Sequence, residues 1–262
     1  MIISWSHGVA DDNMDEDILV ELGHLIVQHP WWMARSRLLL HLLRCIGRRA
    51  PCRIIEAGCG WGVNFSELEK AGYEVTGLDI SRNALARLNN SERMLVEADL
   101  SKDLPVDAPE YDVVLALDVI EHIDDDRGAV RRLAQLTKPG GHVIISVPAL
   151  PELFSEFDRV QGHRRRYTPD SLRSTIAGSG LEIVQIFWWG QWMARLLRKR
   201  TTTTRGCSGE TSTEIYKRYL SLPPWPGVWL LKLMFLIDQS RTIRGRNVVG
   251  TSLFTIAFRP LG

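Results

Sequence analysis

The chain has 262 residues, of which 45% are hydrophobic and 24% charged, a composition typical of an ordinary globular protein. Its 32 lysines and arginines balance 31 aspartates and glutamates, so no overall field favours nucleic acid, and we expect no nucleic-acid partner. The longest apolar stretch, residues 228–237, is interrupted by Lys232 and is much shorter than the ~20 residues that a spanning helix needs, which argues against a transmembrane segment.

The cysteines and the first residues of the chain bear on the cellular compartment of the protein. The four cysteines show no paired metal-ligand spacing, and the first residues lack the cationic and apolar pattern of a signal peptide. We therefore expect a cytoplasmic protein, with peripheral contact at a membrane surface and formation of a homodimer left open.

Residues 1–50 are interpreted as an N-terminal helical cap. After a polar, acidic start, apolar positions recur at helical spacing from Trp31 to Ile46, and Pro30 is well placed in a first turn. This pattern predicts an amphipathic helix over residues 30–48.

From residue 51 the pattern alternates between strands and helices, as in βαβ units. Runs such as Val113-Val114-Leu115 lack polar alternation, which indicates parallel strands buried on both faces. We predict a doubly wound α/β core formed by residues 51–188 and 247–262. Its strands are expected at 53–57, 73–79, 94–98, 111–117, 142–147, 181–187 and 252–258, with helices ending near 71 and spanning 82–88, 126–136 and 169–178.

Residues 189–246 form an insertion before the last strand. It contains Arg198-Lys199-Arg200 and a run of threonines, and it becomes apolar and rich in tryptophan after residue 222. We expect a mobile polar loop followed by an amphipathic helix. Core packing, an apolar lid over an acceptor and a lipid-facing surface are three alternatives for the tryptophans in and beside this insertion, which are Trp188, Trp189, Trp192, Trp225 and Trp229.

The strongest local signal is Glu56-Ala57-Gly58-Cys59-Gly60-Trp61-Gly62, where the first core strand turns into a helix. Glycines there let the backbone approach a ligand at the carboxyl edge of the sheet. A dinucleotide fingerprint needs its third glycine one position later, where this chain has Val63, so the spacing favours S-adenosylmethionine. A tight connection without a ligand is the alternative.

Acidic residues follow the next strands at the same edge. Asp79 ends the second core strand, about twenty residues after the glycine turn, where a carboxylate can accept both hydroxyls of a ribose. Asp99 and Asp118 end the third and fourth strands. A helix cap is the alternative for one such residue, but three in register favour a ligand site.

Together these residues resemble the class I S-adenosylmethionine-dependent methyltransferases, especially the quinone-biosynthesis O-methyltransferases. The resemblance covers roughly residues 31–187 and recurs in the last strand. It rests on Glu56-Ala57-Gly58-Cys59-Gly60, Gly77-Leu78-Asp79, Tyr111-Asp112-Val113-Val114, Asp118-Val119-Ile120-Glu121-His122-Ile123 and Lys138-Pro139-Gly140-Gly141. It implies a seven-stranded, mostly parallel, Rossmann-like sheet in the order 3-2-1-4-5-7-6, with the last strand antiparallel.

The resemblance also implies how S-adenosyl-L-methionine is held. The methionine moiety is expected near Gly58 and Gly60, the ribose on Asp79, and the adenine near Asp99 and Leu100. Arg37 matches an arginine that meets the cofactor carboxylate in the quinone enzymes, although Arg35 competes for this role. The remaining cofactor residues are expected to be Glu56, Cys59, Ile80, Leu117 and Asp118.

Two histidines are candidate general bases, His122 after the fourth core strand and His163 in the loop after the fifth. An imidazole has an ordinary pKa of about 6.5, which suits removal of a proton from the acceptor. A structural hydrogen bond is the alternative for His122. In the quinone enzymes the corresponding acidic group is associated with a divalent metal, which here would involve Asp118, Glu121 and His122; we expect no metal.

Residues 162–169, Gly-His-Arg-Arg-Arg-Tyr-Thr-Pro, resemble a segment of methyltransferases that accompany polysaccharide and glycolipid assembly. This segment makes Arg164, Arg165, Arg166 and Tyr167 candidate substrate-binding residues, because arginines bind phosphate, carboxylate or anionic sugars. An ion-paired surface turn is the alternative.

The sequence therefore predicts a methyltransferase that acts on the hydroxyl of a small molecule, sugar or glycolipid by in-line methyl transfer. The alternatives are N-methylation of a small molecule and a non-catalytic module that binds a cofactor or a partner. A nicotinamide oxidoreductase is disfavoured by the glycine spacing, and a hydrolase by the absence of a G-x-S-x-G elbow.

Overall fold

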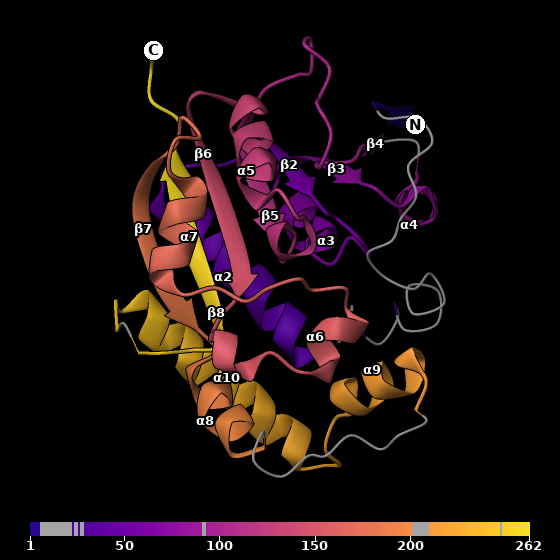
Figure 1. Ribbon diagram of the computed structural model, residues 1–262, viewed down its shortest axis with the longest axis vertical. Helices are drawn as coiled ribbons and strands as arrows, with labels where there is room; N and C mark the ends of the chain where they lie inside the picture. The colour runs from indigo at the N-terminus through magenta and orange to yellow at the C-terminus, as the bar shows by residue number, and fades with distance from the viewer. Residues whose placement is uncertain (6–22, 24–25, 27–28, 91–92, 201–209, 247) are drawn as a thin grey trace.

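A computed structural model describes residues 1–5, 23, 26, 29–90, 93–200, 210–246 and 248–262. Its centre is a mixed eight-stranded sheet with helices on both faces (Figure 1). The strands are β1 (Ile2–Ser4), β2 (Arg53–Ala57), β3 (Glu74–Asp79), β4 (Met94–Glu97), β5 (Tyr111–Leu117), β6 (Thr137–Pro148), β7 (Glu182–Trp189) and β8 (Ser252–Phe258). They lie in the order β1-β4-β3-β2-β5-β6-β8-β7.

The order predicted for seven strands is confirmed for β2 to β8, and β8 is antiparallel to both β6 and β7. The predicted count of seven was wrong, because β1 pairs in parallel with β4 through Ile2–Leu95, Ile3–Val96 and Ser4–Glu97. Residues 2–4 fall within the helical cap that the sequence predicts over residues 1–50. A strand of three residues is too short to show a periodic pattern, yet it covers the unpaired backbone of β4 at the edge.

The helices, in chain order, are α2 (Pro30–Cys45), α3 (Phe65–Lys70), α4 (Arg82–Leu88), α5 (Asp126–Gln135), α6 (Glu156–Val160), α7 (Pro169–Ile176), α8 (Gln191–Arg200), α9 (Ser212–Leu220) and α10 (Gly227–Ile243), with short 3-10 turns η1 (Ile120–His122) and η2 (Pro151–Leu153). The predicted helix 30–48 ends three residues early at Cys45, and Gly47 follows with a φ of 73°. Its start is fixed by His29, whose side chain accepts a hydrogen bond from the Trp31 N–H.

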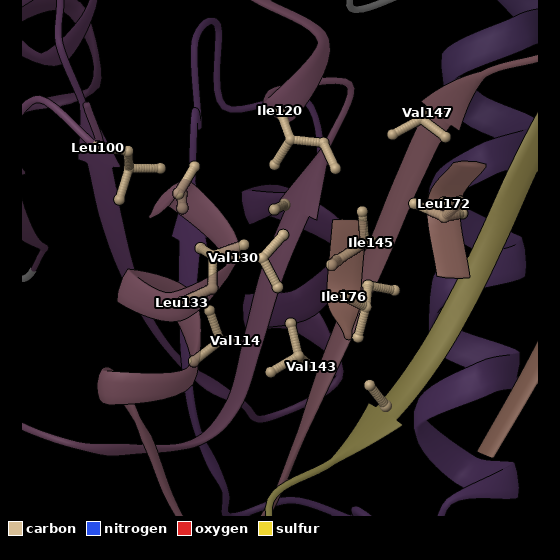
Figure 2. Packing of buried hydrophobic residues seen from close by; sticks show 14 of the residues in the cluster. Leu100, Val114, Ile120, Val130, Leu133, Val143, Ile145, Val147, Leu172 and Ile176 are labelled. Atoms are coloured by element: carbon tan, nitrogen blue, oxygen red, sulfur yellow. The ribbon is translucent and has the colours of Figure 1, made fainter. Parts of the chain in front are cut away.

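Alternate residues of the buried strands supply two cores, one on each face of the sheet. Ile54, Val113 and Ile144 pack with α2 and with Phe235 of α10. Ile55, Val114 and Ile145 face the other way. Figure 2 shows this second core, in which Val130 and Leu133 of α5 and Leu172 and Ile176 of α7 meet the sheet. A strand with two buried faces has no polar side, which explains the continuous apolar runs in the sequence.

The predicted insertion contains three helices, α8, α9 and α10, and not one amphipathic helix. The polar loop expected there falls largely on residues 201–209, which lie outside the described residues, as do most of the residues before Pro30 in the predicted cap. Trp189 is fully buried and belongs to the core, whereas Trp225 and Trp229 are 85% and 63% exposed. A search of the described residues finds no helix with the length and apolarity needed to span a bilayer.

Candidate active site

A cavity of about 240 Å³ lies at the carboxyl ends of β2, β3, β4 and β5. The chain leaves β2 for β3 on one side and reaches β5 on the other, so this is the topological switch point where open α/β sheets bind ligands. The predicted site residues in its lining are Glu56, Gly58, Cys59, Gly60, Asp79, Ile80, Asp99, Leu100, Leu117, Asp118, His122 and His163. The predicted residues outside the lining are Arg37, Glu121, Arg164, Arg165, Arg166 and Tyr167.

The glycine turn after β2 has left-handed backbone at Gly58 and Gly60, with φ values of 70° and 47°. A Cβ on Gly58 would approach Val119 Cγ2 to 2.4 Å, whereas a Cβ on Gly60 would meet no described atom within 4 Å. Gly58 is thus required for packing, and Gly60 leaves its backbone open to the cavity. Burial raises the pKa of the Cys59 thiol well above its ordinary value, so Cys59 is not a thiolate nucleophile.

The carboxylates of Asp79 and Asp99 are fixed by backbone donors. Asp79 accepts hydrogen bonds from the N–H groups of Gly60 at 2.7 Å and Ser81 at 2.9 Å, which joins the end of β3 to the glycine turn. Asp99 accepts a bond from the Ser101 N–H at 2.8 Å. Both side chains are largely buried and line the cavity. They therefore present acceptors in fixed positions at two neighbouring strand ends.

Glu56 is a buried carboxyl group on β2, inside the cavity wall. Its Oε1 accepts a hydrogen bond from Asn64 at 2.5 Å, and Asn64 in turn accepts one from the Ser36 hydroxyl at 2.6 Å. Its buried Oε2 has no hydrogen-bond partner among the described atoms. Burial raises the pKa of Glu56 to about 7, although the Asn64 bond and the positive charge of Arg35 act in the opposite direction.

Arg35, and not Arg37, is the arginine of α2 that reaches the cavity. Arg35 is 6% exposed, forms an ion pair with Asp118, and donates a bond to the Ser146 hydroxyl at 2.5 Å. Ser146 also donates to Asp118 at 3.0 Å. Arg37 lies two residues further along the helix, about 200° around its axis, and is exposed to solvent.

The two candidate bases lie against each other at the cavity. The rings of His122 and His163 are edge to face, with centroids 4.8 Å apart. Burial and the neighbouring His163 lower the pKa of His122 to about 4. His163 is held differently, since its Nδ1 lies 3.0 Å from Oδ1 of Asp158, which is fully buried.

Asp158 is itself fixed by Arg166, which donates from Nε at 2.7 Å and from Nη2 at 2.9 Å. Burial raises the pKa of Asp158, but the hydrogen bonds from His163 and Arg166 outweigh burial and bring it below its ordinary range. Asp158 is therefore a carboxylate and can only accept, so Nδ1 of His163 carries the proton that it shares with Asp158.

Three side chains that could hold a metal ion meet beside these rings, but they are not the predicted three. The ligand atoms of Glu121, His122 and His163 lie within 4.8 Å of one another, whereas Asp118 is paired with Arg35. Both carboxyl oxygens of the fully buried Glu121 are without a hydrogen-bond partner among the described atoms. Burial and the charge of Asp118 raise the pKa of Glu121 well above its ordinary value.

The arginine segment after α6 is an ion-paired turn and does not face the cavity. Arg164 pairs with Asp124 at 2.5 Å, and Arg165 pairs with Asp126 at 3.3 Å. The hydroxyl of Tyr167, which is 2% exposed, also donates to Asp126 at 2.9 Å. These residues join the loop after β6 to the segment after β5.

Several cavity residues were missed by the sequence reasoning. Trp32 of α2 and Tyr216 of α9 line the cavity, together with Gln161 after α6. The helix α9 is held by α6, where Phe157 stacks on Tyr219 with centroids 4.3 Å apart. Ser36 is a polar residue on the buried side of an otherwise apolar helix face, and this pattern could have indicated its hydrogen bond to Asn64. The sequence offered no comparable indication for Tyr216.

A doubly wound sheet with fixed carboxyl groups at three neighbouring strand ends defines a Rossmann-like protein that binds a nucleoside-containing cofactor. The model of the methyltransferase domain family matches residues 31–186. The chain belongs to this family, which confirms the resemblance seen in the sequence.

Curated relatives show how far the likeness extends. A ubiquinone biosynthesis O-methyltransferase of Alkalilimnicola ehrlichii is 37% identical over 115 residues, which are 40% of this chain and 45% of the relative. Another, of Ralstonia nicotianae, is 32% identical over 136 residues, 45% and 56% of the two chains. The chain spans about half the length of these relatives.

Among solved structures, phosphoethanolamine N-methyltransferase 2 of Haemonchus contortus, in complex with S-adenosyl-L-methionine, aligns with a TM-score of 0.54 at 18% identity. The alignment covers 86% of this chain and 52% of that one. At this level of identity the likeness supports the α/β fold.

Proposed function

We propose that the protein transfers a methyl group from S-adenosyl-L-methionine to a hydroxyl oxygen of a small molecule, sugar or glycolipid. The observation that carries the proposal is the cavity at the switch point, where Glu56, Asp79 and Asp99 converge with His163. The names of the curated relatives favour an oxygen acceptor over nitrogen. The arginine segment that resembles methyltransferases of glycolipid assembly favours an acceptor that carries sugar or lipid.

The residues present fit the cofactor. The unpartnered Oε2 of Glu56 is placed to accept a bond from the α-amino group, and Arg35 supplies a positive charge for the α-carboxylate. Asp79 is the acceptor for the ribose hydroxyls, since a carboxylate has about four lone-pair sites and can bind further donors. Asp99 and Leu100 flank the adenine. When bound, S-adenosylmethionine supplies a methyl group made electrophilic by a sulfonium charge.

The chain's own contribution is alignment and proton removal. Fixed groups on four strands hold the reactants in place, and such positioning supplies several kcal/mol of the rate enhancement. His163 takes the hydroxyl proton at Nε2, because Asp158 holds the proton on Nδ1. His122 is the weaker base, since its pKa of about 4 lies far below neutral pH. We propose that this proton transfer proceeds without a metal.

The first test is calorimetric titration of the purified chain with S-adenosylmethionine, S-adenosylhomocysteine and, as a control, a dinucleotide. We expect both sulfur compounds to bind and Asp79→Ala to weaken both. Transfer of labelled methyl to hydroxyl-containing acceptors in a fractionated extract then tests the reaction. Binding without transfer to any acceptor would favour a non-catalytic module, and tight binding of the dinucleotide would contradict the proposal.

A further inference from the structure

Helix α10 presents an apolar face to solvent. Trp229 and Leu230 are 63% and 53% exposed, and Leu236 and Ile237 are 50% and 45% exposed. Trp225, just before the helix, is 85% exposed. A helix that is apolar all round is normally covered on every side, so this outer face requires an occupant.

The inner side of the same helix is firmly attached. Phe235 packs against the rings of Trp31, Trp189 and Trp192, with centroids 5.6, 5.9 and 5.2 Å away. Asp238 is 2% exposed and accepts bonds from the backbone N–H groups of residues 190 and 191, at 2.8 and 3.0 Å. The outer apolar residues are therefore displayed on a fixed helix and not on a loose segment.

Among the described residues, the exposed charges of the two helices that form this face, α2 and α10, are all positive. Helix α2, which packs beside α10, contains no aspartate or glutamate, and Asp238, the acidic residue of α10, is buried. The exposed cations of this region are Arg37, Lys232, Arg241, Arg244 and Arg246. No carboxylate within the described parts of the chain lies at ion-pairing distance from any of them. In a chain of net charge +1, this local excess of cations selects a negatively charged occupant.

A groove between α2 and α10 adds depth to the face. It has a volume of about 320 Å³ and is lined mainly by apolar side chains, among them Met33, Leu233 and Leu236, while Arg37 and Lys232 also line it. Apolar side chains beside exposed lysine and arginine match the boundary between acyl chains and anionic headgroups, where tryptophan is also favoured. Arg37 lines this groove and does not line the cofactor cavity.

We propose that α10, with Trp225, Trp229 and the surrounding cations, docks the protein on the surface of a membrane that contains anionic lipids. Figure 1 shows α8, α9 and α10 gathered at the end of the molecule towards which the arrow of β6 points, the carboxyl edge that holds the cavity. Docking through α10 places the cavity at the same end of the molecule as the bilayer. The docking proposal depends on surface features alone and is independent of the methyl transfer proposed above.

The experiment is flotation of the full chain, without cofactor or acceptor, with vesicles of phosphatidylcholine alone or with about one third phosphatidylglycerol. We expect at least ten-fold stronger binding to the anionic vesicles, and loss of most of that gain at high salt. The variant Trp225→Ser with Trp229→Ser should reduce binding at least ten-fold. Its control, Val184→Ser, changes an apolar residue that is 61% exposed on β7 and should bind as the unaltered chain does.

A charge-reversed pair, Lys232→Glu with Arg241→Glu, should abolish the preference for anionic vesicles, whereas Arg49→Glu, at an exposed position beyond the other end of α2, should keep it. Absence of vesicle binding, or equal binding by the tryptophan variant, would overturn the proposal. So would a dimer in light scattering that the tryptophan variant dissociates and that does not bind vesicles, because the occupant would then be a second copy of the chain.

Discussion

The site predicts that the affinity for S-adenosylmethionine depends on pH, because Glu56 titrates near neutral pH. Burial raises the pKa of Glu56 in the cofactor-free protein to about 7. The ionised carboxylate attracts the ammonium group of S-adenosylmethionine, and the protonated form does not. At pH 6.0 about one tenth of Glu56 is ionised, and at pH 7.5 about three quarters. Affinity should therefore rise about eight-fold over this interval, or about 1.2 kcal/mol.

The variant Glu56→Gln keeps an oxygen that can accept the Asn64 bond, so the wall of the cavity is preserved. It should bind S-adenosylmethionine with an affinity that is flat between pH 6.0 and 7.5. At pH 7.5 it should be about 10- to 100-fold weaker than the unaltered chain, because a hydrogen bond to a charged group contributes about 1.5–3 kcal/mol. The control is Glu74→Gln, which removes an exposed carboxylate at the start of β3.

Calorimetry at several pH values measures these affinities, and thermal unfolding of the cofactor-free chain gives a second measurement. Because the pKa of Glu56 is raised in the folded state, its contribution to stability is fully present below about pH 4.5 and is lost as the pH rises through about 7, by up to about 3 kcal/mol. Glu56→Gln should lack this loss. A flat affinity in the unaltered chain, or the same slope in Glu56→Gln, would refute the role given to Glu56.

Four further outcomes follow from the site. Asp79→Ala should weaken S-adenosylhomocysteine binding at least ten-fold in calorimetry, since the ribose loses a charged acceptor, and unchanged affinity would remove Asp79 from the site. His163→Gln should lower kcat about 100-fold or more with little change in cofactor affinity, and an equal loss in His122→Gln alone would move the base to His122. Asp158→Asn should lower kcat and alter the nitrogen NMR signals that report the Nδ1-protonated tautomer of His163, whereas a purely structural role would change only thermal stability. Chelation by EDTA should leave turnover unchanged; activity lost and then restored by Mg²⁺ or Mn²⁺ would assign Glu121 and both histidines to a metal.

The sequence predicted the sheet well because its strands are buried on both faces and are bounded by clear turns. The limits of β5 and β8 were predicted to the residue, and the order of β2 to β8 followed from the family resemblance. The edge strand β1 could not be foreseen, since pairing along three residues leaves no periodicity. The three helices of the insertion were also unforeseen, although the capping box of Thr211 with Glu214 at the start of α9 was a signal present in the sequence.

The predicted cofactor residues at the strand ends lie together at the cavity for a geometric reason: the carboxyl ends of adjacent parallel strands meet at one edge. The apolar periodicity of α2 separates Arg35 from Arg37, because position 35 lies within the apolar stripe of the helix and position 37 on the opposite side. Arg35 pairs with Asp118, and Arg37 lines the groove beside α10. The helix thus joins the cofactor cavity to the proposed docking surface.

Residue type alone did not reveal the carboxylate partners of the arginine segment. Three successive arginines match an anion site, yet each has a carboxylate partner on the protein. Buried carboxylates are costly unless they are paired, and the hydrogen bonds from His163 and Arg166 together hold the pKa of Asp158 below its ordinary range. An ionised Asp158 in turn fixes the tautomer of His163. In the proposed mechanism the segment acts through Arg166, which fixes Asp158 and thereby the base, and Trp32, Gln161 and Tyr216 of the cavity lining are the candidates for contact with the acceptor.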